Sequence, residues 1–365
     1  MHIGIDARLP YYRTGGISTY IRKLIAALEQ IDDRNRYTVF RSRKMRESLT
    51  TRFLQAGLWT PCHHQLERLA LSLELARHRL DVLHSPDFIP PLRGARRHVI
   101  TVHDLTFLHF PQFLTADSRR YYNDQIQAAV RHADHILSDS EATKHDMITM
   151  IDVPPGKITV HMLGVDDSFK PLPADELARV QAAYDLPPEY ILFVGTFEPR
   201  KNIGGLLEAY ELLLRRLPDS IPLVLSGMRG WLFEETMARI EQMKLGDRVL
   251  WREDTPRRAL PALYNLARVL VVPSFYEGFG LTALEAMACG TVPIVSNRSS
   301  LPEVVGPVGL QIDPDDPQTL ADALEQALID DAWLAQMERA GLERAASFTW
   351  EKTAQVALSV YQAVN

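Results

Sequence analysis

The sequence predicts an α/β protein made of two Rossmann-like domains, whose parallel sheets face each other across an interdomain cleft. Three observations support this prediction. The chain has 365 residues, a length typical of two domains. Short apolar runs rich in β-formers alternate with segments of helical periodicity, which indicates βαβ units. The alternation pauses once, in a stretch rich in Pro, Gly and Asp, and then starts again.

The first domain is expected over residues 1–170. Its strands are predicted at His2–Asp6, Val82–His84, His98–His103 and His135–Ser138. Its helices are predicted at Ile17–Gln30, Asp117–Arg131 and Ser140–Met150. Ser138 and Glu141 are spaced like a capping box at the start of the last of these helices.

The second domain is expected over residues 171–348, after a linker placed around Leu163–Pro173 and Asp185–Pro188. Its strands are predicted at Tyr190–Gly195, Pro222–Ser226, Arg248–Trp251, Val269–Val272 and Val292–Ser296. Its helices are predicted at Ile203–Arg216, Trp231–Met243, Pro256–Leu266, Leu281–Cys289, Gln318–Ile329 and Ala332–Ala346. Residues 349–365 carry a last helix, Trp350–Ala363.

Ligands of open parallel sheets bind beyond the carboxyl ends of the strands, so functional side chains are expected directly after strands. Glu277 lies in the loop after Val269–Val272, and Glu285 lies about one turn into the following helix. A carboxylate accepts paired hydrogen bonds and therefore suits a sugar diol. A capped helix with two surface acids explains the spacing equally well.

The same loop can bring backbone groups to a ligand. Gly278 and Gly280 allow close approach of the main chain. The N–H groups near Phe279, Gly280 and Leu281 precede a helix, where the helix dipole favours anionic or sugar oxygens.

Arg200 and Lys201 stand side by side after the strand Tyr190–Gly195 and before a helix. The helix dipole disfavours cations at this end, so a ligand explains them better than a solvated surface does. They are predicted to bind an anion such as a diphosphate through charge-assisted hydrogen bonds and to neutralise its charge without a metal ion.

In the first domain, Gly15 and Gly16 follow the first strand and open a helix, so their amides are candidates for binding a phosphate. His103 and Asp104 end the strand His98–His103. A single histidine is more often structural, but its place at a strand end favours a functional role.

The segment Glu277-Gly-Phe-Gly-Leu-Thr-Ala-Leu-Glu285 resembles the Glu-(seven residues)-Glu motif of GT-B glycosyltransferases, and in particular the mannosyltransferase-like members of glycosyltransferase family 4. The resemblance covers nearly the whole chain. It implies a GT-B fold, retention of anomeric configuration and no required metal. It also implies that Glu285 holds the nucleotide ribose, and that Glu277 holds donor sugar hydroxyls with the amides of Phe279 and Gly280.

The resemblance extends to the other candidates. It implies that Gly15 and Gly16 approach the donor phosphate from the first domain, which would bind the acceptor. It places His103 beside the reacting sugar, to contact a donor hydroxyl or to steady a developing oxocarbenium charge, with Asp104 on the acceptor side. Family members commonly carry an arginine directly after the glycine at 195, where this chain has Thr196.

The sequence therefore predicts a retaining glycosyltransferase that moves a hexose, with mannose from GDP-mannose as the first expectation, to a saccharide or lipid-linked acceptor in polysaccharide or glycolipid synthesis. No cofactor or metal is expected. The last helix is expected to cross back to the first domain. Two alternatives stay open: a sugar-nucleotide epimerase of similar fold, and a catalytically silent nucleotide-sugar-binding protein.

Composition indicates which compartment and which binding partners suit the chain. The only cysteines are Cys62 and Cys289, which favours a reducing cytoplasm. A pI of about 6.1 without a basic stripe argues against nucleic acid. The segment Arg41–Trp59 mixes basic and apolar residues and could rest on the inner face of a membrane, although an ordinary solvated helix explains it as well. The Asp313-Pro-Asp315 sequence is expected to form a turn rather than a metal site.

Overall fold

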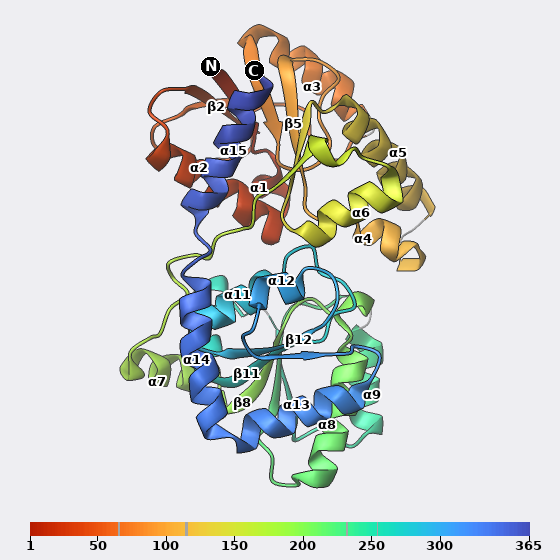
Figure 1. The fold of residues 1–365 in the computed structure, drawn as a ribbon, viewed down its shortest axis with the longest axis vertical. Coiled ribbons are helices and arrows are strands. Elements are labelled where there is room, and N and C mark those ends of the chain that lie inside the picture. The colour runs from red at the N-terminus through yellow and green to blue at the C-terminus, as the bar shows by residue number, and fades with distance from the viewer. Residues whose placement is uncertain (65, 114–115, 231–232, 254) are drawn as a thin grey trace. The chain divides into compact units, whose positions relative to one another are not determined.

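The computed structural model describes residues 1–64, 66–113, 116–230, 233–253 and 255–365, and it divides the chain into two compact units (Figure 1). Unit 1 comprises Met1–Gly164 together with Thr349–Asn365, and unit 2 comprises Val165–Phe348. The chain therefore leaves unit 1 once and returns to it with its last helix.

Unit 1 is built on a seven-stranded, all-parallel sheet of strand order β3-β2-β1-β4-β5-β6-β7. The strands are β1 (His2–Asp6), β2 (Arg36–Ser42), β3 (Leu54–Leu58), β4 (Leu80–Ser85), β5 (Ala95–Val102), β6 (His135–Ser138) and β7 (Ile158–Val160). The central strands are buried on both faces, as in other parallel sheets covered by helices, and this explains their nearly continuous apolar sequences.

The helices of unit 1 are α1 (Leu9–Tyr12), α2 (Gly16–Ile31), α3 (Glu67–Leu75), α4 (Thr106–His109), α5 (Ala116–His132), α6 (Glu141–Ile151) and α15 (Trp350–Val364). The last helix, α15, packs along α2 (Figure 1). It is fixed there by a buried hydrogen bond of 2.7 Å between the Tyr361 hydroxyl and Nδ1 of His84 on β4. The C-terminal helix is thus an integral part of the first unit.

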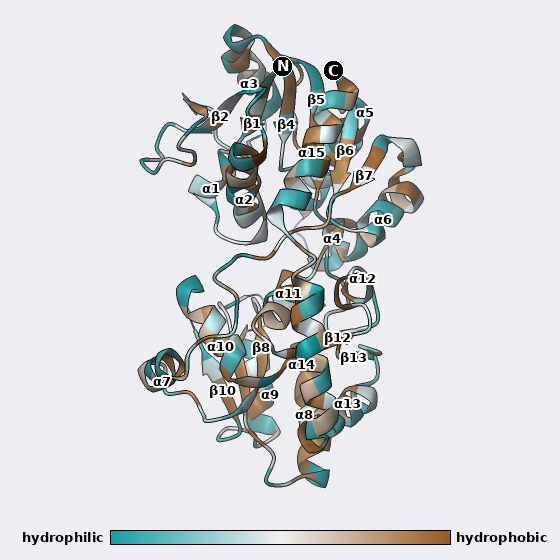
Figure 2. Ribbon diagram, turned by 60° about the vertical axis from the view of Figure 1, so that its left-hand side comes forward, coloured by the Kyte–Doolittle hydropathy of each residue, from teal (hydrophilic) through white to brown (hydrophobic). Residues whose placement is uncertain are grey.

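Unit 2 has a six-stranded, all-parallel sheet of order β10-β9-β8-β11-β12-β13. The strands are β8 (Tyr190–Val194), β9 (Leu223–Ser226), β10 (Val249–Arg252), β11 (Ala267–Val272), β12 (Val292–Ser296) and β13 (Leu310–Ile312). The strands are largely hydrophobic, whereas the helices carry both hydrophobic and hydrophilic residues (Figure 2). The neighbouring pair β8 and β11 marks the switch in strand order, where a ligand is expected.

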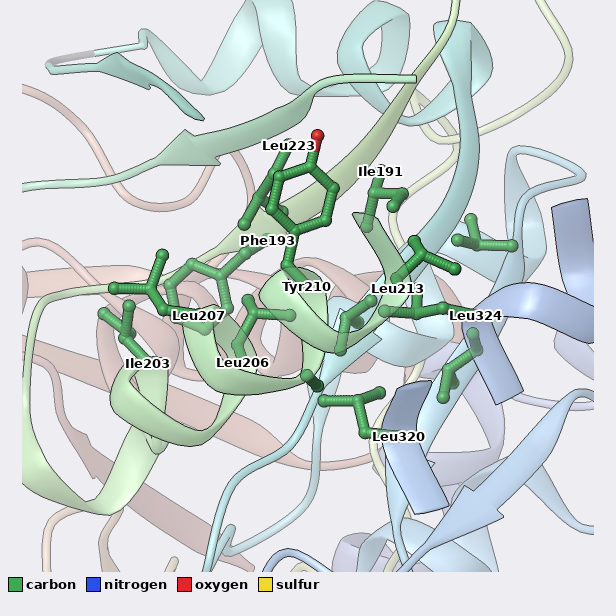
Figure 3. Close-up of a cluster of buried hydrophobic side chains, with 14 of the residues drawn as sticks. Ile191, Phe193, Ile203, Leu206, Leu207, Tyr210, Leu213, Leu223, Leu320 and Leu324 are labelled. Atoms are coloured by element: carbon green, nitrogen blue, oxygen red, sulfur yellow. The ribbon is translucent and has the colours of Figure 1, made fainter. Parts of the chain in front are cut away.

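The helices of unit 2 are α7 (Ala174–Ala183), α8 (Ile203–Arg216), α9 (Phe233–Gln242), α10 (Leu260–Leu266), α11 (Leu281–Ala288), α12 (Leu301–Val305), α13 (Pro317–Ile329) and α14 (Asp331–Ala345). Helix α8 buries Leu206, Tyr210 and Leu213 on one face, against the sheet and α13 (Figure 3). The Tyr210 hydroxyl donates to the carbonyl oxygen of Ile221 at 2.9 Å. This packing fixes the position at which α8 begins, directly after Arg200 and Lys201.

The segment Arg41–Trp59 is not a helix, which corrects one prediction. It ends β2, turns, and returns as β3, whose Leu54–Leu58 pairs in parallel with Thr38–Ser42. Phe53 stacks on the buried ring of Tyr37 at 4.3 Å. The apolar residues of this segment are therefore divided between sheet, core and surface, and they do not share one helical face.

One local prediction also differs from the structure in detail. Helix α6 is capped by Ser140, whose side chain accepts from the Thr143 amide at 3.1 Å, and not by a box of Ser138 and Glu141. Ser138 donates instead to the Ser140 carbonyl oxygen at 3.0 Å. The expected start of a helix at Trp231 lies outside the described residues. Among the described helices, none combines the length and the apolar character needed to cross a bilayer.

Candidate active site

The loops after β8 and β11 join Arg200, Lys201 and Glu277 in one buried ion-pair cluster. Oε1 of Glu277 accepts from Nζ of Lys201 at 2.6 Å and from the hydroxyl of Ser274 at 2.7 Å. Oε2 accepts from the Arg200 guanidinium at 2.9 Å. Glu277 is only 8% exposed. The residues predicted to bind a diphosphate and a sugar are thus direct neighbours.

The local chain path explains this arrangement. Pro199–Lys201 forms a single 3-10 turn after β8. Asn202 then adopts a left-handed conformation with φ of 54° and caps α8 by accepting from the Gly205 amide. The Phe275 amide donates to the Arg200 carbonyl oxygen at 2.8 Å, which joins the two loops through the backbone. Both cations are therefore held at the carboxyl end of the sheet by the local chain path.

Electrostatics keeps the cluster charged. Burial alone raises the pKa of the Glu277 carboxyl, but the adjacent Lys201 and Arg200 outweigh burial and lower this pKa to about 2. The pKa of Lys201 is lowered, first by burial and then by Arg200, against the opposing pull of Glu277. Glu277 is consequently an anion at any physiological pH.

Further along the loop, the backbone turns into α11. Gly280 has a φ of 99° and precedes the helix, and a Cβ added to it would meet Leu301 at 2.7 Å. Gly278 and Phe279 lead into this turn, and the Phe279 ring is buried edge-on against Phe348 at 6.1 Å. The Leu281 amide belongs to the first turn of α11, where N–H groups lack acceptors within the helix.

Glu285 lies on the buried side of α11 and has its own partners. Its Oε2 accepts from the Tyr264 hydroxyl at 3.1 Å, and its Oε1 accepts from Arg257 at 3.2 Å. Burial raises the pKa of this carboxyl to about 7, because the opposing effects of Arg257 and Tyr264 are smaller. Glu285 therefore titrates near neutral pH, in contrast to Glu277.

Thr196 lies in the loop after β8. The loop after β9 passes very close to it. A Cβ added to Gly227 would lie 1.9 Å from the carbonyl oxygen of Gly195. Because the obstructing atom belongs to the backbone, only glycine permits this approach of the two loops.

Gly227→Ala is therefore expected to destabilise unit 2. An overpacked position typically costs about 1–3 kcal/mol, so we expect a lower melting temperature and a displaced loop after β8. Gly246→Ala is the matched control, because an added Cβ there meets no heavy atom within 4 Å. Thermal unfolding of the two variants checks the expectation, and equal melting temperatures would contradict it.

The predicted residues of unit 1 lie at the carboxyl edge of its own sheet. Helix α2 begins at Gly16, and Gly15 precedes it with a φ of 137°. The Gly15 carbonyl oxygen accepts from the Thr19 amide at 3.0 Å, so the amides before Thr19 have no acceptor within the helix. Both glycines are exposed. This geometry suits an anion.

His103 is held by two acceptors. Its Nδ1 lies 2.6 Å from Oδ2 of Asp139, and its Nε2 lies 2.7 Å from the Pro86 carbonyl oxygen. Since an ionised carboxylate and a carbonyl can only accept, both ring nitrogens donate and the ring is an imidazolium. Burial lowers its pKa, but Asp139 and Pro86 outweigh burial and raise it to about 9. His161 shares the same carboxylate at 3.2 Å.

Asp104, the predicted acceptor-side residue, also has a structural contact. Its Oδ1 accepts from the Thr106 amide at 2.9 Å and so holds the start of α4.

The Asp313-Pro-Asp315 sequence forms the expected turn before α13, and the carboxylates of both aspartates pair with Arg298. Throughout the described ranges, no group of three or more His, Cys, Asp and Glu side chains is arranged to hold a metal ion.

Several supporting residues were not predicted. Ser299 accepts from the Glu277 amide at 2.9 Å, and Ser300 donates to the Glu277 carbonyl oxygen at 2.8 Å. Arg257 and Tyr264 hold Glu285. The only sequence signal was indirect, since the two serines follow β12 and so lie at the same sheet edge. Their pairing with the loop after β11 depends on the neighbouring positions of β11 and β12.

The chain is similar to known proteins over most of its length. Residues 175–344 match the model for glycosyl transferases group 1, and residues 14–169 match that for glycosyltransferase family 4. O-antigen chain mannosyltransferase B of Escherichia coli is 36% identical over 282 residues, which are 77% of this chain and 74% of that protein. Sucrose-phosphate synthase of Thermosynechococcus elongatus superposes with a TM-score of 0.80 at 23% identity, over 100% of this chain and 98% of that chain.

A third similar protein is HepE of Anabaena, solved in complex with UDP and glucose, with a TM-score of 0.79 at 17% identity and full coverage of both chains. Two parallel Rossmann-like sheets of this kind make up the GT-B fold. The chain belongs to glycosyltransferase family 4, the group 1 glycosyl transferases. The predicted family and fold class are thereby confirmed.

Proposed function

We propose that the protein is a retaining, metal-independent hexosyltransferase that moves mannose from GDP-mannose to a saccharide or lipid-linked acceptor in polysaccharide or glycolipid synthesis. The observation that carries the proposal is the pairing of Arg200 and Lys201 with Glu277 at the switch point of the second sheet. Mannose as the sugar and polysaccharide as the product rest on the similarity to O-antigen chain mannosyltransferase B.

In this proposal, unit 2 binds the donor. Arg200 and Lys201 bind the diphosphate, and Glu285 accepts hydrogen bonds from the ribose diol. A carboxylate offers about four acceptor sites, and Arg200, Lys201 and Ser274 donate to three of those on Glu277. Glu277 uses the fourth to accept a hydrogen bond from a sugar hydroxyl. Amides near Gly280 complete the donor contacts.

Unit 1 is proposed to bind the acceptor, with Gly15 and Gly16 donating amides to the donor phosphate. The glycosidic bond breaks as the cations stabilise the leaving diphosphate. The acceptor hydroxyl then attacks the same face, and the departing phosphate oxygen takes its proton. His103, which Asp139 and the Pro86 carbonyl oxygen hold in place, is proposed to lie beside the reacting sugar; its charge is balanced by Asp139, so it does not repel a developing oxocarbenium ion.

A transfer assay tests the proposal against its two alternatives. GDP-mannose and a mannosylated saccharide acceptor are incubated with the protein in EDTA, and the product is analysed by NMR. The proposal predicts a new α-linked mannose together with released GDP. An isomerised sugar nucleotide without transfer would identify an epimerase, and nucleotide binding without either product would identify a silent binding protein.

A specific surface of unit 1 supports peripheral membrane contact, which we propose as a second feature of the function. Leu66, Leu69 and Leu73 follow one face of α3, and Leu73 is 81% exposed. Trp59 is 69% exposed, and its backbone passes beside the same helix, because its amide donates to the Glu74 carboxylate. We refer to these four exposed side chains together as the α3 face.

Arginines surround the α3 face. The guanidinium of Arg43 lies 3.1 Å above the Trp59 ring, and Arg77 and Arg93 are exposed nearby. The Arg93 amide donates to the Ser72 hydroxyl of α3, which places that arginine beside the helix. Apolar side chains framed by cations match the interface of an anionic bilayer, so we assign this face to such a membrane.

The variant Leu69→Asp with Leu73→Asp is expected to lose binding to vesicles containing phosphatidylglycerol, because it places charge on the inserting surface. Ile329→Asp, which replaces an exposed residue of α13 in unit 2, is the matched control and should bind like the unchanged protein. Vesicle flotation measures both. Flotation that is equal with zwitterionic vesicles, or unaffected by the double substitution, would contradict the assignment.

A further inference from the structure

Glu277 occupies a position that its proposed contact with the donor sugar does not explain. Its carboxylate pairs with both Arg200 and Lys201, at 2.9 and 2.6 Å. Ser274 of the same loop holds its side chain, and Ser299 of the loop after β12 holds its backbone amide. The carboxylate is therefore built into the diphosphate site itself.

This placement changes the charge that a diphosphate would meet. The Glu277 side chain is only 10% exposed, and those of Arg200 and Lys201 are 21% and 11% exposed. Little solvent screens these charges from one another, so one of the two positive charges is cancelled locally. Glu198 also pairs with Arg200, at 3.0 Å, but its side chain is 38% exposed and more strongly screened.

A transferase must release the nucleoside diphosphate after each turnover, and release often limits the rate. Two uncompensated buried cations would hold a diphosphate tightly after the sugar has left. We propose that Glu277 acts as a fixed counter-ion to Arg200 and Lys201, which weakens binding of the product diphosphate and so speeds its release. The inference rests on the proposed function, because it takes these cations as the diphosphate ligands.

Free nucleoside diphosphates separate this role from a contact with the sugar. They contain no sugar, so a carboxylate that served only the sugar hydroxyls would leave their affinity unchanged. A counter-ion that opposes the diphosphate makes the opposite prediction. Neutralising Glu277 while keeping its shape should strengthen diphosphate binding.

The test compares Glu277→Gln with the unchanged protein by calorimetric titration with GDP and UDP. The dissociation constant of the preferred diphosphate is expected to fall on the order of ten-fold in Glu277→Gln, with a steeper salt dependence. Product inhibition should tighten in parallel, while kcat falls. Glu198→Gln, the matched control on the same arginine, should change the dissociation constant by less than about two-fold.

A second pair of variants guards against misfolding of Glu277→Gln. Lys201→Met retains one cation and Glu277, and the double variant Lys201→Met with Glu277→Gln removes the carboxylate charge as well. The double variant should bind the diphosphate more tightly than Lys201→Met. Unchanged or weaker binding in the folded Glu277→Gln or double variant would overturn the counter-ion role. Failure of the unchanged protein to bind any nucleoside diphosphate would instead refute the proposed function.

Discussion

Lys201→Met is expected to reduce kcat by roughly 10²–10³-fold, because it removes a buried cation aimed at the leaving diphosphate. Methionine keeps most of the side-chain length, so the packing of the loop after β8 should survive. The variant leaves Glu277 with Arg200 and Ser274 as partners. Steady-state transfer rates at saturating donor measure the effect directly.

The loss should exceed that from removing an exposed charge of the same unit. Arg258→Ala is the matched control, since Arg258 is exposed in the turn before α10 and should leave kcat nearly unchanged. Breaking a buried ion pair can also cost about 3–5 kcal/mol of stability, so the melting temperature has to be recorded beside the rate. A folded Lys201→Met protein with a normal kcat would remove Lys201 from the proposed mechanism.

Nucleotide affinity is expected to depend on pH through Glu285. Burial raises the pKa of this carboxyl to about 7, so below that pH the proton competes with hydrogen bonds from the ribose diol. One pH unit below the pKa, about a tenth of the carboxyl remains ionised. The dissociation constant of the nucleotide should therefore be roughly ten-fold higher at pH 6 than at pH 8.

The raised pKa of Glu285 also makes the free energy of unfolding depend on pH, in the direction opposite to that of nucleotide affinity. A carboxyl whose folded-state pKa is raised contributes stability below its unfolded value, and this contribution is lost as the pH rises towards 7. Binding should strengthen over the range in which this contribution falls. Glu285→Gln is the control, because it cannot titrate while the diphosphate still can. A pH dependence of affinity that is identical in the two proteins would exclude Glu285 as its source.

The limits of sequence-based prediction are clear in the sheets. Strands such as β8 and β11 were predictable because they are short, apolar and buried on both faces. β3 was not, since this edge strand, Leu54–Leu58, is only partly buried and has little apolar pattern. β7 and β13 have three residues each, too few for a periodicity.

The residues of the candidate site were also predictable only in part. Residues directly after strands were predictable, so Arg200, Lys201, Glu277 and Glu285 could be named from the sequence. The ion pair between Lys201 and Glu277 could not, because it joins positions 76 residues apart through the pairing of β8 with β11. The contrasting pKa values of Glu277 and Glu285 likewise depend on burial and on neighbours from other loops.

The central claim is that unit 2 binds a nucleoside diphosphate through Arg200 and Lys201 without a metal ion. A thermal-shift panel with GDP, UDP, ADP and dTDP, each with and without EDTA, tests it most directly. A ligand that binds only the folded state raises the melting temperature. We expect a clear rise with one diphosphate, GDP as the first expectation, which EDTA leaves unchanged and which is smaller in Lys201→Met. No rise with any diphosphate, or a rise that EDTA abolishes, would contradict it.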